Sequence, residues 1–121
     1  RDYFAETSIF PIMHTVVIRR DIYEAHRWVA QALYKAFVEA KRRAWENYFE
    51  TAAMKYMLPW MVTHVESTMG TFGRDWWQYG FAENRETLEV FLRYHYEQGL
   101  SSRLMTPEEL VAPECLESFV I

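Results

Sequence analysis

The sequence contains a single cysteine, Cys115, among its 121 residues. One thiol excludes an intrachain disulfide and a cluster of thiolate metal ligands within the chain. Basic residues are not in surplus either, because 13 Lys and Arg stand against 17 Asp and Glu, which gives a formal net charge of −4. A nucleic-acid-binding protein needs a basic face to neutralise phosphates, so we expect no nucleic-acid partner.

Long apolar runs are also missing. The longest uncharged segments, residues 9–18 and 56–65, have about half the length that spans a bilayer. The chain starts at Arg1 and shows no positively charged and then apolar leader, so no signal peptide is visible. We therefore expect no membrane partner.

Aromatic residues are abundant: 5 Trp, 8 Tyr and 8 Phe make up 17% of the chain, beside only 4 Gly and 4 Pro. These side chains carry more large apolar surface than a helical domain of this size normally buries. Together with the missing start, this surplus predicts that the chain is a piece of a longer protein.

Residues 9–18, with the sequence IFPIMHTVVI, form the one segment that predicts a β-strand. The run is apolar nearly throughout and rich in β-branched residues, which is typical of a strand buried on both faces of a sheet. No second segment of similar quality follows. Its pairing partners would therefore have to come from residues outside this chain or from another chain.

The remainder of the sequence predicts helices. Asp21, with Glu24 three residues later, resembles a capping box ahead of a long helix from about Glu24 to about Glu50. The other expected segments are a helical stretch over 51–57, a helix from Pro59 to about Met69, an aromatic loop over 70–80, a helix over 82–98 that Gly99 ends, and a short helix that starts at Thr106-Pro107 and stops at Pro113. The expected fold class is mostly α, with one buried β-strand and four to five helices.

Motifs for common chemistry are absent. The four histidines have no Asp, Glu or His partner at helical metal-ligand spacing, the glycines form no phosphate-binding loop, and no serine stands in a nucleophile elbow. The sequence thus implies no cofactor and no metal. The run Lys41-Arg42-Arg43 is interpreted as a solvated helix face, and Cys115 as an inert thiol.

Two features leave alternatives open. His14 lies mid-strand, where it is either a core histidine bonded to a backbone carbonyl, the interpretation we favour on sequence alone, or a proton donor that faces a cleft. The loop with Trp76, Trp77 and Tyr79 is either a substrate lid or, as we prefer, a loop packed against the core.

Several long motifs resemble the 4,5-dihydroxyphthalate decarboxylase family along essentially the whole chain. They are residues 9–21 followed by Trp28-Val29-Ala30, then Leu58-Pro59-Trp60, residues 75–80, 84–89, 91–94, 97–101 and 106–110. One departure is His26-Arg27 ahead of Trp28, where relatives often have a proline directly before the Trp. This difference should alter only the entry into the helix.

The resemblance implies a type II periplasmic-binding-protein-like fold, in which two α/β lobes enclose a ligand cleft. The chain would be the C-terminal portion of such a protein. Residues 1–20 would contain the strand that crosses between lobes, and residues 21–121 would form a helical tail packed on the first lobe.

The implied activity is conversion of 4,5-dihydroxyphthalate to protocatechuate and CO2 in the cytoplasm, with His14 as the catalytic residue and Phe10 and Met13 as substrate-binding walls. The expected partner is a small aromatic carboxylate, and a homo-oligomer is possible. The fragment alone is expected to be inactive. The alternative is a solute-binding protein of an ABC-type transporter, which would be periplasmic if a signal peptide precedes the chain, since one fold serves both functions.

Overall fold

The computed structural model describes residues 1–117 of the chain, and within them the secondary structure is helical. The five α-helices and two 3₁₀ turns are α1 (Asp2–Thr7), α2 (Arg20–Ala25), α3 (Trp28–Phe49), α4 (Met61–Phe72), α5 (Phe81–Glu97), η1 (Pro107–Leu110) and η2 (Pro113–Cys115). The last four residues of the expected tail over 21–121 lie outside the described part.

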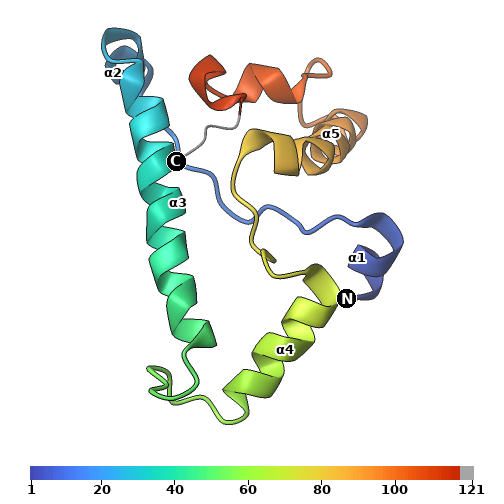
Figure 1. The fold of residues 1–121 in the computed structure, drawn as a ribbon. Helices are drawn as coiled ribbons and strands as arrows, with labels where there is room; N and C mark the ends of the chain where they lie inside the picture. The colour runs from blue at the N-terminus through green and yellow to red at the C-terminus, as the bar shows by residue number, and fades with distance from the viewer. Residues whose placement is uncertain (118–121) are drawn as a thin grey trace.

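Helix α3 is the longest element; α2 lies at its N-terminal end, and α1, α4, α5 and the C-terminal turns lie on one side of it (Figure 1). Helix α4 packs against α3, η2 packs against α3 as well, and η1 packs against α5. Helix α1 joins the end of α4 through Phe4 and Phe72, whose ring centroids are 4.6 Å apart.

The predicted strand over residues 9–18 is wrong. Residues 10–18 are irregular, and in the part of the chain that the structure describes their backbone makes no hydrogen bond. Only Ile9 is buried, whereas Val17 is 87% exposed. The apolar pattern alone cannot form a strand, because the backbone groups need a neighbouring strand to pair with.

The helix expected over 24–50 is divided into α2 and α3 at His26 and Arg27. The N–H of His26 still donates to the carbonyls of Ile22 and Tyr23, at 2.9 and 3.2 Å, which ends α2 there. The capping role predicted for Asp21 is wrong. Asp21 lies in the first turn of α2, where its carboxylate accepts hydrogen bonds from the Arg19 guanidinium, and this contact lowers its pKa.

Residues 51–57 are irregular instead of helical, and α4 starts at Met61, two residues after Pro59. The residue in between, Trp60, has a left-handed backbone with φ 55°. Residues other than glycine rarely adopt this backbone conformation, and here it turns the chain into α4.

The C-terminal part follows the prediction more closely. Helix α5 covers nearly the expected residues and ends before Gly99, which has φ 71°, while the Leu100 N–H donates to the His95 carbonyl. Thr106 and Glu109 form a capping box at the start of a 3₁₀ turn. Pro113 begins a second turn, η2, and does not merely stop the first.

The interior of this arrangement is small. The buried apolar side chains of the described residues are Ile9, Ala30, Met61, Val65, Leu92 and Pro107. The chain exposes 9427 Å², whereas a compact monomer of its 14.6 kDa mass has about 6,900 Å² of accessible surface. About 2,500 Å² of surface therefore remains that a self-contained domain would bury.

Candidate functional site

The structure places the three predicted site residues on the extended segment between α1 and α2. Phe10 is half-buried, and its ring packs edge-on against Phe72 and Trp77, with centroids 5.4 Å away in both cases. Met13 is 66% exposed and His14 is exposed. The interpretation of His14 as a buried core histidine is thus wrong for this chain, and its side chain is accessible.

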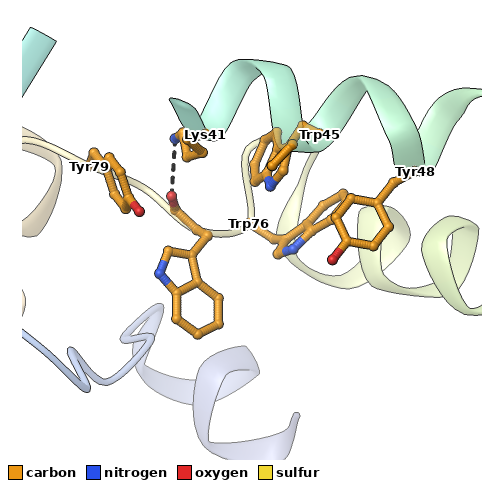
Figure 2. Close-up of a pocket in the computed structure, with 7 residues that line it drawn as sticks. Lys41, Trp45, Tyr48, Trp76 and Tyr79 are labelled. Carbon is orange, nitrogen blue, oxygen red and sulfur yellow. Dashed lines mark hydrogen bonds between the residues drawn. The ribbon is translucent and has the colours of Figure 1, made fainter. Parts of the chain in front are cut away.

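An aromatic pocket of about 340 Å³ lies beside this segment, between α3 and the loop that joins α4 to α5. It is lined by Lys41, Ala44, Trp45, Tyr48, Trp76, Trp77 and Tyr79. Figure 2 shows the side chains of α3 and of the loop facing one another across it. Below, "aromatic pocket" means this set of residues.

Ring stacking holds the loop on α3. Trp76 stacks on Trp45 with centroids 4.6 Å apart and a 26° angle between the planes, and Tyr48 meets Trp76 edge-on at 6.3 Å. Such pairs add stability beyond the area that they bury. At the end of the loop, the Asn84 amide donates to the carbonyls of Gln78 and Gly80. The loop therefore packs on α3 through Trp76, as the preferred interpretation expected, while Trp77 and Tyr79 remain 43% and 36% exposed.

Lys41 is the one basic side chain that lines the aromatic pocket. Its Nζ donates to both Asp75 carboxylate oxygens, at 2.9 and 3.1 Å, and to the Trp77 carbonyl at 3.0 Å. It also lies 4.8 Å from the ring centroids of Trp45 and of Tyr79. Only 13% of the side chain is exposed, so this ammonium joins α3 to the loop.

Sequence reasoning missed Lys41 because it was grouped with Arg42 and Arg43. Those two arginines do form an exposed face, where they pair with Glu39 and lower the pKa of its carboxyl to about 2. Position 41 differs because it lies three residues after Val38 and four before Trp45, both of which are half-buried, on the less exposed side of the helix. That spacing is the signal that separates it from its neighbours.

The pocket and the predicted site are connected through Trp77. Its ring is the edge-on partner of Phe10, and its carbonyl accepts a hydrogen bond from Lys41. The Lys41 ammonium is already hydrogen-bonded to Asp75 and Trp77. The pocket therefore offers a ligand mainly the apolar surface of its rings. The contact of Phe10 with Trp77 thus joins the extended segment to the aromatic pocket.

Among residues 1–117, no group of three His, Cys, Asp or Glu side chains is arranged to hold a metal ion. None of the helices in that range combines the length and apolar character needed to cross a bilayer.

Comparison with known proteins gives a specific relationship. No protein-family model matches the chain. However, the chain is 39% identical over 120 residues, 99% of its length, to 4,5-dihydroxyphthalate decarboxylase of Comamonas testosteroni. The resemblance to this decarboxylase is confirmed. The chain spans only 36% of the length of that relative, which is consistent with a fragment of such a protein.

Proposed function

We propose that this chain is the C-terminal portion of a cytoplasmic carboxy-lyase that converts 4,5-dihydroxyphthalate, or a closely related aromatic dicarboxylate, to protocatechuate and CO2. The observation that carries the proposal is the 39% identity to a decarboxylase of this name over nearly the whole chain. Since the match covers 36% of that relative, the activity belongs to the longer polypeptide. The chain alone is expected to be inactive.

The reaction requires one proton and no external oxidant. The ring hydroxyl para to the departing carboxylate donates electron density to the carbon that bears it. An acid protonates this carbon, the bond to the carboxylate breaks, and its electron pair returns to the ring as CO2 leaves. The lost carboxylate is replaced by hydrogen, and recovery of aromaticity drives the step.

His14 is the proposed proton donor, because an imidazole can donate a proton near neutral pH. Its exposure and its place on the extended segment leave it accessible to a ligand. Phe10 and Met13 are the proposed apolar walls, and the contact of Phe10 with Trp77 extends that wall toward the aromatic pocket. The donors that would hold the second carboxylate belong to the rest of the longer polypeptide.

The test is an assay of the full-length protein that contains this chain, with 4,5-dihydroxyphthalate labelled in its carboxyl carbons. The proposal predicts release of labelled CO2 and equal amounts of protocatechuate. A protein that binds a different solute tightly and releases no CO2 would instead be a transporter's solute-binding protein, and the proposal would be wrong.

A further inference from the structure

An apolar corner joins α3 to α4 at one end of the molecule, where Tyr56 stacks on Tyr48 of α3 with ring centroids 5.2 Å apart. It consists of residues 54–60, whose bulky members are Met54, Tyr56, Met57, Leu58 and Trp60. Figure 1 shows this connection at the far end of the molecule from α5 and the C-terminal turns. Met57 is 102% exposed and Trp60 is 78% exposed, and Lys55 is the one charged residue of the corner.

The backbone enforces this exposure. Trp60 has φ 55°, a conformation that a non-glycine residue rarely adopts without a reason in its surroundings. The Met61 N–H donates to the Leu58 carbonyl and the His64 N–H donates to the Trp60 carbonyl, so the turn is fixed by the start of α4. The turn that carries the exposed Trp60 ring is therefore held by backbone hydrogen bonds at the start of α4.

The surface of the whole chain indicates what kind of partner covers it. The excess of about 2,500 Å² over a compact monomer corresponds to the loss on each side of a large, permanent interface. A specific complex of standard size covers only about 800 Å² per partner. The missing partner is thus extensive and protein-like.

A lipid surface fits the corner less well. Peripheral segments that insert aromatic side chains into membranes carry basic residues that attract anionic lipids. Here the corner has only Lys55, and the chain has a net charge of −4.

We propose that the apolar corner docks on the part of a longer polypeptide that this chain does not include. This inference rests on the proposed function in one respect, namely that the chain is a portion of a longer protein. The chain spans 36% of the length of the known relative. Met57 and Trp60 are the central contacts, and large apolar side chains of this kind dominate permanent interfaces.

The test uses a chimera in which this chain replaces the matching portion of the Comamonas testosteroni decarboxylase. Oxidation of Met57 by hydrogen peroxide, followed by mass spectrometry, reports its accessibility. We expect Met57 to react about as fast as free methionine in the isolated chain and at least about ten-fold more slowly in the chimera. Met61, which is 3% exposed, should be slow in both.

A charge placed in the corner supplies the matched comparison. Trp60→Lys should leave the helical content of the isolated chain unchanged and lower the melting temperature of the chimera. Ser102→Lys, which adds the same charge at an exposed position after α5, should change neither. If Trp60→Lys leaves the chimera as stable as Ser102→Lys does, the proposal is wrong.

Other occupants give distinct results. Protection of Met57 in a dimer of the isolated chain, or by anionic vesicles, with no protection in the chimera would overturn the proposal. If the chimera does not fold, the native decarboxylase is used instead, and amide hydrogen exchange is measured in its segment that aligns with residues 54–60. Fast exchange in that segment would contradict the proposal. None of these readouts uses turnover, so failure of the proposed activity would be seen separately.

Discussion

Lys41 and Asp75 join the longest helix to the aromatic loop, with Nζ 2.9 Å from one carboxylate oxygen and 3.1 Å from the other. They lie 34 positions apart in the sequence. The Lys41 side chain is largely buried among rings, whereas that of Asp75 is 54% exposed. Loss of the Lys41 contacts should therefore destabilise the fold more than loss of the Asp75 carboxylate. Removal of Lys41 leaves the Trp77 carbonyl and the rings of Trp45 and Tyr79 without their cation.

Replacement of Lys41 by methionine keeps the apolar stem and removes the charge. We expect Lys41→Met to lower the free energy of unfolding by about 1–3 kcal/mol, the sum typical of a charge-assisted hydrogen bond and cation–π contacts. Urea unfolding followed by tryptophan fluorescence measures it. Arg43→Met, on the exposed face of the same helix, should cost less than half as much. Equal losses would show that Lys41 has no special role.

The capping box of η1 predicts a pH dependence. Hydrogen bonds from the Arg103 guanidinium lower the pKa of Glu109 from its usual value to about 2. A lowered folded-state pKa means that the unfolded state binds the proton more readily, so this contribution to stability is full above the unfolded pKa, near 4.5, and is lost as the pH falls toward 2. NMR titration of the Glu109 carboxyl measures this pKa. A value near 4.5 would contradict the contact.

The thiol of Cys115 should react slowly. Burial, and secondarily the neighbouring Glu114 carboxylate, raise the pKa of this thiol above its usual value. Less thiolate is then present at neutral pH, and the thiolate is the reactive form. We expect reaction with a disulfide reagent at pH 7.5 to be at least about five-fold slower than that of glutathione. A rate equal to or faster than glutathione would place Cys115 in an open, activated environment.

The role of His14 is tested in the full-length protein. If His14 donates the proton, His14→Ala should lower kcat by about 100-fold or more, the usual contribution of general acid catalysis. His26→Ala, at an exposed histidine between α2 and α3, serves as the control and should retain normal turnover. Normal turnover in His14→Ala would remove this residue from the mechanism.

The helices were predictable because their apolar residues repeat with the helical period and because proline, glycine and capping residues mark several ends. Helix α5 and the start of η1 at Thr106-Pro107 follow from those local signals. A strand over residues 9–18 could not be predicted from local sequence, because a strand needs a neighbouring strand for its backbone hydrogen bonds and the sequence pattern does not show whether one is present. The left-handed Trp60 and the break at His26 likewise depend on how the chain turns between helices.

The candidate site was predictable only in part. The aromatic loop was expected to pack on the core, and the stacking of Trp76 on Trp45 shows how it does so. Lys41 was missed because three consecutive basic residues look alike until their positions on the helix are compared. The proximity of Phe10 to Trp77 joins segments that are distant in sequence, and no local pattern indicates such a contact.

The most direct test of the proposed function is decarboxylation by the chimera that carries this chain in place of the matching portion of the Comamonas testosteroni enzyme. Folding is checked first by circular dichroism, and the reaction with 4,5-dihydroxyphthalate is followed by CO2 release. We predict CO2 and protocatechuate in equal amounts. A chimera that folds and binds the substrate but releases no CO2 would contradict the account.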